Sequence, residues 1–470
     1  MSDSKSIPMT VPGHVYRRRR AELAQALKRP LVLQAGHAPA RTYPTNPHRF
    51  RAGSTYLYFG GPPLEHAALL IEPGSDGEVG CTLLRPPAGP DDALWVGEVP
   101  DDVALAAAAD LPVTALASPD QLPALLSGRP AAAVTPPFPQ AMQWARRMKL
   151  RAANQAELRA IIRQRLTKDE HELDAMRRAA RVGMAAHRAA MSACRPGRLE
   201  ADAAAAFTAV LVANQCDHAF NPIVTVRGEV LHGHGHPNKL EDGALLVVDG
   251  GAEEPTGYAS DFTRTMPVSG RWSPIQRHLY ETVLRAVETA TAACVAGRRY
   301  REVHDLAAGV ICAGLVAAEL LRGDPAELAA RTAHALFFPH GVGHLIGLDA
   351  HDMEDFGDLA GYAPGRKRRH EFGSRFLRLD RDLEPGMTVT IEPGIYAVPA
   401  IWACPELVQP LADVINRPKV DALLAERFGG IRIEHVVAVR AEGGPEILSA
   451  ELPTDPDEVA ACVGAACPAG

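Results

Sequence analysis

Two aspartates sit where a strand-like segment meets a turn in this sequence. Asp249 ends the apolar run 245–248, and Asp261 comes twelve residues later. A hairpin between these positions would bring the two carboxylates side by side. Neighbouring carboxylates repel each other unless they share a proton or bind a cation. The segment therefore permits a cation site, and a pair of turn-capping aspartates remains the alternative.

Two glutamates belong to similar apolar surroundings further along the chain. Glu392 ends the segment 387–391, and Glu434 alternates with isoleucines in Ile-Arg-Ile-Glu. A carboxylate at the end of an apolar strand is partly buried and needs a partner. Arg432 shares one strand face with Glu434, so an edge strand with a local salt bridge is the alternative to a binding role.

Three histidines fall within twelve residues of a glycine-broken segment. His340, His344 and His351 are separated by glycines that leave the backbone free to bend. A single histidine is most often a structural residue, whereas three in such a stretch favour a ligand and acid–base set. The glycines do not have the Gly-x-Gly-x-x-Gly spacing, so nucleotide binding is not expected.

Four carboxylates and one imidazole suffice to hold two divalent ions. Oxygen-rich ligation with one nitrogen suits Mn²⁺ or Co²⁺, tolerates Zn²⁺ and disfavours soft Cu(I). Two ions at roughly 3.5–4 Å would share a water and lower its pKa toward 7. This combination of residues predicts hydrolytic chemistry.

The elements that would position these residues belong to the longer, C-terminal part of the chain. After residue 155 the pattern of apolar residues changes to that of long helices, which places a domain boundary near 165. A helix pair followed by strands occurs twice, which indicates two related halves of one α+β domain. The expected helices are 157–165, 168–191, 200–214, 273–296 and 303–321, and the expected strands are 223–226, 245–249, 388–392 and 431–439.

The N-terminal part alternates short strands and helices, which predicts a small α/β domain. The arginine run 17–20 is interpreted as a solvated helix face. No potential catalytic groups cluster here. The expected strands are 31–34, 54–59, 67–71, 80–84 and 131–134, and the expected helices are 17–27, 102–109 and 120–126.

The composition excludes several classes of protein. Forty-nine basic and 56 acidic residues give a net charge of −7, which argues against a protein that wraps nucleic acid. The longest apolar stretch, 306–318, is shorter than the roughly 18 residues needed to span a bilayer. Without a secretory signal or a Cys-x-x-Cys pair, the eight cysteines are expected as reduced thiols in a cytoplasmic protein.

With their flanking residues, these segments resemble the pita-bread metallopeptidases, and in particular their aminopeptidase P and prolidase branch (peptidase family M24B). The motifs are Asp261-Phe-Thr-Arg-Thr, His340-Gly-Val-Gly-His344, Ile391-Glu-Pro-Gly394 and Arg432-Ile-Glu434. The likeness runs from about 168 to 459, and residues 51–60 resemble the N-terminal domain of the same enzymes. It implies an α+β protein of the creatinase/prolidase type. A pita-bread catalytic domain, 166–470, would follow a smaller α/β domain, 1–165.

The resemblance also implies roles for individual residues. Two divalent metal ions, with Mn²⁺ preferred over Co²⁺ or Zn²⁺, would be bound by Asp249, Asp261, His344, Glu392 and Glu434. Asp261 and Glu434 would touch both ions, and Glu392 would also take the proton of the attacking water. His232 matches a histidine near the scissile peptide, and His351 matches one that stabilises the oxyanion. His340, Arg378 and Arg432 match residues that contact the substrate, whereas His234 and His236 are expected on the surface.

The activity implied is hydrolysis of the Xaa–Pro bond at the N-terminus of a peptide with proline in second position. A homo-oligomer, dimer or tetramer, is expected, with no nucleic acid and no membrane as partners. Three features depart from the family pattern. His435 follows Glu434 where members often have Asp, the aspartate hairpin is one residue longer than in bacterial aminopeptidase P, and the segment 397–428 is long as in prolidase. An Xaa-Pro dipeptidase, a non-catalytic pita-bread binding module and a creatinase-like C–N hydrolase are the alternatives.

Overall fold

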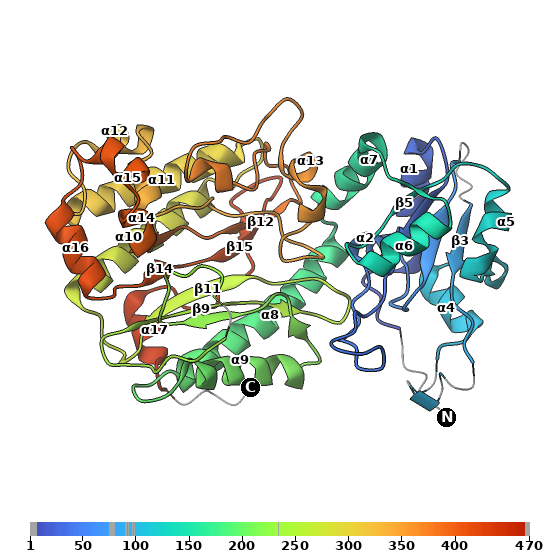
Figure 1. Ribbon diagram of the computed structural model, residues 1–470, viewed down its shortest axis with the longest axis horizontal. Coiled ribbons are helices and arrows are strands. Elements are labelled where there is room, and N and C mark those ends of the chain that lie inside the picture. Colours follow the sequence, from blue (N-terminus) through green and yellow to red (C-terminus); the bar gives the residue numbers. More distant parts are fainter. Residues whose placement is uncertain are drawn as a thin grey trace. The chain divides into compact units, whose positions relative to one another are not determined.

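The computed structural model describes residues 7–74, 80–89, 92, 94, 95, 97, 99–233 and 235–465. The chain divides into two compact units, Met1–Leu166 and Thr167–Gly470 (Figure 1). Each unit builds its own sheets and its own buried core.

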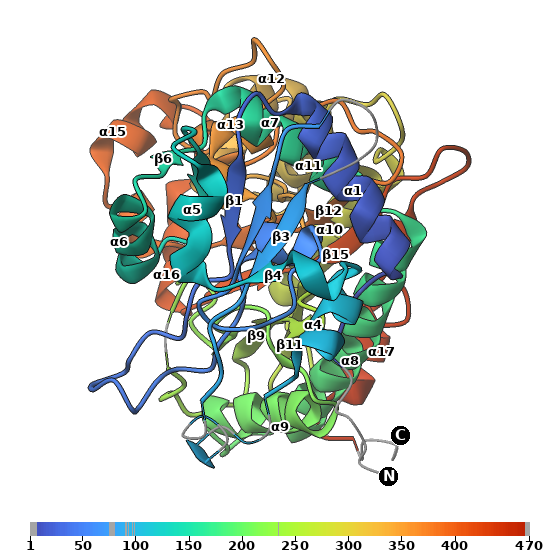
Figure 2. The same cartoon turned by 90° about the vertical axis from the view of Figure 1, so that its right-hand side faces the viewer.

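A six-stranded sheet with the order β4-β3-β2-β1-β5-β6 forms the centre of the first unit. β1 (Leu31–Gln34) pairs antiparallel with β2 (Ala68–Ile71) and parallel with β5 (Ala132–Val134). Figure 2 shows α5 and α6 on one side of this sheet and α1 and α4 on the other. The remaining elements are α1 (Gly13–Ala26), β3 (Cys81–Leu84), α4 (Asp102–Ala109), β4 (Leu116–Ala117), α5 (Leu122–Leu126), α6 (Pro139–Arg147), β6 (Arg151–Ala152) and α7 (Gln155–Leu166).

The segment 54–59, expected as a strand because of its aromatic residues, is a helix. α2 spans Ser54–Tyr58 and buries Tyr56 and Tyr58. The hydroxyl of Tyr58 donates to the carbonyl oxygen of Gln164 at 2.9 Å, a partner more than 100 residues away. The strand prediction was wrong because such tertiary packing outweighs the β propensity of aromatic residues.

The arginine run 17–20 is solvated only in its first half. Arg19 and Arg20 are 3% and 1% exposed, although both carry full charges. The guanidinium of Arg20 donates to the carbonyl oxygens of Phe59 (3.2 Å) and Ala109 (2.7 Å). The expectation of a solvated face was wrong for these two residues, because backbone acceptors compensate their desolvation.

Two helix pairs, each followed by antiparallel strands, make up the second unit, as Figure 1 shows. α8 (Glu170–Ala193) packs against α9 (Glu200–Ala213) and contacts β9 and β11, whereas α10 (Pro274–Ala292) packs against α11 (Tyr300–Ala317) and contacts β12 and β15. This repetition is the one that the sequence indicates. The strands are β7 (Asp217–His218), β8 (Ile223–Thr225), β9 (Leu245–Gly250), β10 (Ala252–Glu253), β11 (Phe262–Pro267), β12 (Thr388–Ile391), β13 (Gly394–Tyr396), β14 (Gly430–Arg432), β15 (His435–Ala438) and β16 (Glu446–Ile447).

The segment 431–439 is not one strand, as expected, but two. β14 pairs with β13, and β15 pairs with β12, so the chain changes neighbours between Arg432 and His435. The opposite segment passes from β12 to β13 at the matching point, next to Pro393, which has no N–H to donate to a ladder. The break leaves Glu392 and Glu434 facing each other between two ladders, outside regular pairing.

The long segment 397–428 is helical. It contains α14 (Pro399–Trp402), α15 (Pro405–Val408) and α16 (Arg417–Ala425). The short helix α12 (Pro325–Ala330) packs against α11. Two further helices of this unit are α13 (Asp358–Gly361) and α17 (Pro456–Cys462).

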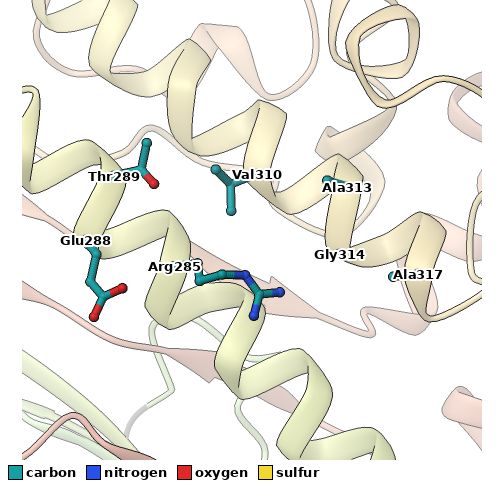
Figure 3. Close-up of a pocket in the computed structure, with 7 residues that line it drawn as sticks. All are labelled: Arg285, Glu288, Thr289, Val310, Ala313, Gly314 and Ala317. Atoms are coloured by element: carbon teal, nitrogen blue, oxygen red, sulfur yellow. The ribbon is translucent and has the colours of Figure 1, made fainter.

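A surface groove of about 340 Å³ runs between α10 and α11 (Figure 3). Its lining combines small and apolar side chains of α11 with polar side chains of α10. It shares no residue with the acidic and histidine motifs. The lining residues are Arg285, Glu288, Thr289, Val310, Ala313, Gly314 and Ala317.

The state of the cysteines and the character of the helices complete the description of the fold. The seven cysteines in the described part of the chain are free, and Cys467 lies outside it. Among the described residues, no helix combines the length and the apolar character needed to cross a membrane.

Candidate metal centre

Three predicted ligands meet in the interior of the second unit. Asp261 precedes β11, His344 lies in the glycine-rich loop, and Glu434 lies in the break between β14 and β15. One ligand atom from each of the three lies within 4.8 Å of the other two, and all three residues are buried. Segments that are far apart in the sequence thus supply two carboxylates and one imidazole to one point.

The two remaining predicted ligands border this trio. Glu392 Oε1 lies 3.5 Å from His344 Nε2, and Asp261 Oδ2 lies 3.6 Å from the same nitrogen. Asp249 lies on β9 opposite Thr263 of β11, and its carboxylate pairs with Arg432. All five predicted ligands therefore belong to one neighbourhood.

In the antiparallel pairing of β9 with β11, Asp249 lies opposite Thr263, and Asp261 comes two residues before Thr263, on the same face of the ladder, as the hairpin prediction requires. Beside them the two chains approach so closely that a Cβ on Gly251 would lie 1.7 Å from the carbonyl oxygen of Ser260. No residue larger than glycine fits there without moving the backbone. Gly251 therefore helps to set the separation of the two aspartates.

Burial and mutual repulsion raise the pKa values of three of these carboxylates, those of Asp261, Glu392 and Glu434. Burial and the charges of Glu434, Asp249 and Glu392 raise the pKa of Asp261 well above its usual range. Burial, with Glu392 and Asp249, does the same to the pKa of Glu434. Burial raises the pKa of Glu392 to about 7, and Arg432 opposes this shift.

These residues fit divalent cations. Asp261 Oδ1 is buried and has no hydrogen-bond partner among the described residues. Hard oxygen ligands with one nitrogen match Mn²⁺, Co²⁺ or Zn²⁺. A cation would compensate both the orphaned oxygen and the repulsion between the carboxylates.

Backbone and hydroxyl groups orient the ligand side chains. His344 Nδ1 lies 2.9 Å from the carbonyl oxygen of Leu345, which can only accept, so Nδ1 carries the proton and Nε2 presents its lone pair to the carboxylates. Burial lowers the pKa of His344 well below its usual value, which keeps the ring neutral. Thr263 Oγ1 donates to Glu434 Oε2 at 2.7 Å, and Thr390 Oγ1 lies 3.4 Å from Glu392 Oε1.

Arg432 is buried and pairs with Asp249, not with its strand neighbour Glu434. Its Nε donates to Thr263 Oγ1 and its Nη1 to the hydroxyl of Tyr396, each at 3.0 Å. The local salt bridge considered from the sequence is therefore absent from the ion pairs of the described residues. Arg432 instead links the predicted ligand Asp249 to Thr263, which in turn contacts Glu434.

The predicted catalytic and substrate-contacting histidines lie around the same centre. The ring of His351 packs on that of His344, with centroids 4.1 Å apart. His340 Nε2 lies 2.9 Å from the hydroxyl of Tyr396, and burial lowers the pKa of His340 to about 3. His232 is an exposed residue whose ring is nevertheless partly desolvated, and this desolvation, together with the charges of Arg432 and Arg378, lowers its pKa.

His236 is half-buried, with Nδ1 3.1 Å from the carbonyl oxygen of Val224. The surface prediction for this residue was wrong in part, because the backbone oxygen holds the ring against β8. His234 lies outside the described residues.

Several residues of the site were not among the predictions from sequence. Thr263 contacts the predicted ligand Glu434, whereas Tyr396 contacts His340 and Arg432. Both residues lie within or next to a motif, so alternation along a strand could have indicated them. Glu354 pairs with His351 and with Arg378. Its spacing of three residues from His351 is the only sequence signal for it.

A buried ion pair anchors the loop that carries His351. Lys168 Nζ lies 2.8 Å from Asp352 Oδ2, and both side chains are 1% exposed. A Cβ on Gly347 would lie 2.6 Å from Asp352 Oδ2 and 2.7 Å from Lys168 Cε, so glycine is needed beside the pair. No motif connects Lys168 with Asp352, because they are 184 residues apart.

Replacing Lys168 with methionine is expected to destabilise the protein by about 3–5 kcal/mol, because it leaves the Asp352 carboxylate buried without its cation. Urea unfolding, followed with metal present, measures this change. Lys419→Met is the matched control, since Lys419 pairs with Glu319 on the surface, where side chains are 55% and 68% exposed. This control should change stability by less than about 1 kcal/mol. Equal destabilisation by the two variants would contradict the anchoring role.

Comparison with known families decides the classification of the chain. The profile of metallopeptidase family M24 matches residues 174–441, and that of the aminopeptidase P N-terminal domain matches residues 16–132. The chain belongs to metallopeptidase family M24. The family predicted from the motifs is confirmed.

Known relatives of this M24 chain carry two kinds of name. The Xaa-Pro aminopeptidase of Escherichia coli (strain K12) is 32% identical over 316 residues, 64% of this chain and 60% of that protein. A probable Xaa-Pro aminopeptidase of Aspergillus fumigatus is 28% identical over 94% of this chain and 96% of its own length. The Xaa-Pro dipeptidase of Rattus norvegicus is 34% identical over 64% of this chain and 61% of its own. The alignments with the Escherichia coli and Rattus proteins thus span less than two thirds of those relatives.

Solved structures resemble this M24 chain along almost its whole length. Proline aminopeptidase P II from Yersinia pestis superposes with a TM-score of 0.79 at 26% identity, covering 96% of this chain and 99% of that one. The aminopeptidase PepP of Pseudomonas aeruginosa gives a TM-score of 0.77 at 29% identity, with 96% and 98% covered. A zinc-substituted Escherichia coli aminopeptidase P in complex with product gives 0.78 at 26% identity, with the same two coverages. The predicted α+β class, a pita-bread domain preceded by a smaller N-terminal domain, is confirmed.

Proposed function

We propose that this protein is a dinuclear-metal peptidase that hydrolyses the Xaa–Pro bond at the N-terminus of peptides. The observation that carries the proposal is the convergence of Asp261, His344 and Glu434, with their ligand atoms within 4.8 Å of one another. Asp249 and Glu392 complete a set that suits two divalent ions. The names of the relatives, Xaa-Pro aminopeptidase and Xaa-Pro dipeptidase, support the proline specificity.

Bound divalent ions would lower the pKa of water and polarise the peptide carbonyl. The remaining steps fall to side chains of this chain. Glu392 accepts and returns a proton, which suits a carboxylate whose pKa burial raises to about 7. His351 and His232 donate hydrogen bonds at the scissile peptide, and His340, Arg378 and Arg432 position the substrate.

Proline explains why a dedicated site is needed. Its nitrogen carries no hydrogen, and its ring fixes φ, so an Xaa–Pro bond is a poor substrate for proteases that bind extended peptides by main-chain hydrogen bonds. A site that recognises a free N-terminus followed by proline avoids this requirement.

The identity of the metal ion, the cellular location and the oligomeric state are part of the same proposal. We propose Mn²⁺ as the working ion on the basis of the oxygen-rich ligand set. The protein would act in the cytoplasm as a dimer or tetramer. Metal analysis of protein purified without added ions, with size-exclusion chromatography coupled to light scattering, tests the ion and the assembly.

An Xaa-Pro dipeptidase is the second candidate. The helical segment 397–428 favours it, because this insert resembles prolidase in length. The Rattus norvegicus relative carries the same name. Comparison of Xaa-Pro dipeptides with Xaa-Pro-Xaa tripeptides under added Mn²⁺ separates the two functions, and a protein that leaves tripeptides intact is a dipeptidase.

Replacing Arg378 with alanine is expected to change dipeptide and tripeptide cleavage to similar extents. The guanidinium already pairs with Glu354 and is 36% exposed, so it does not close the site around a dipeptide. The measurement is kcat/KM for both substrate lengths in the wild type and in Arg378→Ala. A loss of roughly 30-fold or more confined to dipeptides would indicate a buried carboxylate partner and favour the dipeptidase.

A further inference from the structure

Glu354 lies between two residues that the proposed reaction uses. Its Oε1 pairs with Arg378 Nη1, and its Oε2 pairs with His351 Nδ1. All three side chains are partly open to solvent, with exposed fractions of 45% for Glu354, 36% for Arg378 and 38% for His351. One carboxylate therefore satisfies both groups at the rim of the candidate metal centre.

Glu354 carries its negative charge at neutral pH. The hydrogen bond from His351 and the charge of Arg378 lower the pKa of Glu354, although burial opposes the shift. The charge of Arg378 also contributes to lowering the pKa values of His232 and His340, so its positive charge acts on two residues predicted to contact the substrate. The cation that could receive a substrate carboxylate is thus occupied by a carboxylate of the chain itself.

We propose that Glu354 is a specificity-determining residue that disfavours Xaa-Pro dipeptides and selects longer peptides. This inference rests on the proposed function. A dipeptide carries its C-terminal carboxylate directly on the proline, so docking at Arg378 would set this anion beside Glu354 or require displacing Glu354. A longer peptide has a neutral amide at the same place and meets no such repulsion. Discrimination by a repulsive element is a general route to specificity.

The solvent exposure of the Glu354–Arg378 ion pair limits how strongly Glu354 can disfavour dipeptides. Ion pairs at this exposure are weak, so Glu354 competes with a substrate carboxylate without excluding it. Removing its charge should therefore raise dipeptide cleavage roughly three- to tenfold relative to an uncharged analogue.

The test compares Glu354→Gln with the wild type on an Xaa-Pro dipeptide and on the same dipeptide with a C-terminal amide. The two substrates differ only in the carboxylate. The expected result is a three- to tenfold rise in the carboxylate-to-amide ratio of kcat/KM. The double variant Glu354→Gln/Arg378→Ala should cancel the rise, since the freed guanidinium is what receives the carboxylate.

Asp358→Asn is the matched control. Asp358 pairs with Arg368 at 2.6 Å in a neighbouring part of the same segment, and their side chains are 50% and 34% exposed. This variant should leave the ratio unchanged.

Two results would overturn the inference. An unchanged ratio, with both substrates changing equally or not at all, would mean that Glu354 does not distinguish them and acts at most by orienting His351. A rise that persists without Arg378 would show that the ion pair does not discriminate substrate length. Failure of the wild type to cleave any Xaa-Pro substrate would refute the proposed function instead. In that case, calorimetric binding of the dipeptide and its amide to the metal-loaded variants still tests the charge preference, and equal affinities in wild type and Glu354→Gln would refute it.

Discussion

Replacing Glu434 or Asp261 with alanine is expected to abolish peptide hydrolysis and to reduce the metal bound per chain. Both carboxylates are buried and meet His344 at one point, so each removal deletes a ligand that no neighbour can replace. Loss of a ligand expected to touch two ions disorders both. Activity on an Xaa-Pro-Xaa peptide and elemental analysis of the purified variants measure the two effects.

Glu446→Gln serves as the control for these ligand variants. Glu446 is partly buried and pairs with Arg177 and Arg440, away from the carboxylate cluster. Its variant should keep both metal and turnover. Two metals per chain and normal turnover in Glu434→Ala would remove Glu434 from the ligand set, and circular dichroism distinguishes loss of metal from loss of fold.

The alanine variants of His351 and His232 are expected to keep their metal and to lose rate, by about 10²–10³-fold in kcat. His351 packs on His344 and pairs through Nδ1 with Glu354, so Nε2 is the ring nitrogen left for a substrate, and it donates a hydrogen bond when the ring is protonated. His232 is exposed beside the same centre, as suits a residue that contacts substrate. Steady-state kinetics and metal content of each variant are the measurements.

His236→Ala is the matched histidine control, because its ring contacts the backbone of Val224 and not the predicted ligands. It should change kcat by less than about twofold. Loss of metal from His351→Ala would show instead that His351, and not only its neighbour, is a ligand.

Local patterns predicted most elements of the fold. The helix expected at 102–109 is α4 with the same bounds, and the apolar run 245–249 became β9. Such segments carry their own periodicity and turn residues, so their type depends little on distant contacts. The strand expected at 54–59 failed because the burial of Tyr58 against Gln164 decides its conformation.

The five ligands were predicted from the motifs and their order along the chain, and the structure brings these residues together. The sequence could not show that Glu392 and Glu434 meet at a common break, because that follows from which strand each segment pairs with. The pairing of Arg432 with Asp249 instead of Glu434 has the same origin.

The sequence by itself determined the family, the class of the fold and the five candidate ligands, because motifs and periodicity are local properties of the chain. Only the tertiary structure decided which charges compensate each other. Lys168 reaches Asp352 across 184 residues, and Glu354 reaches Arg378 across 24. Ion pairs of this kind depend on distances between side chains that the fold creates, and no spacing along the chain encodes them. The proposed control of substrate length by Glu354 therefore became visible only in three dimensions.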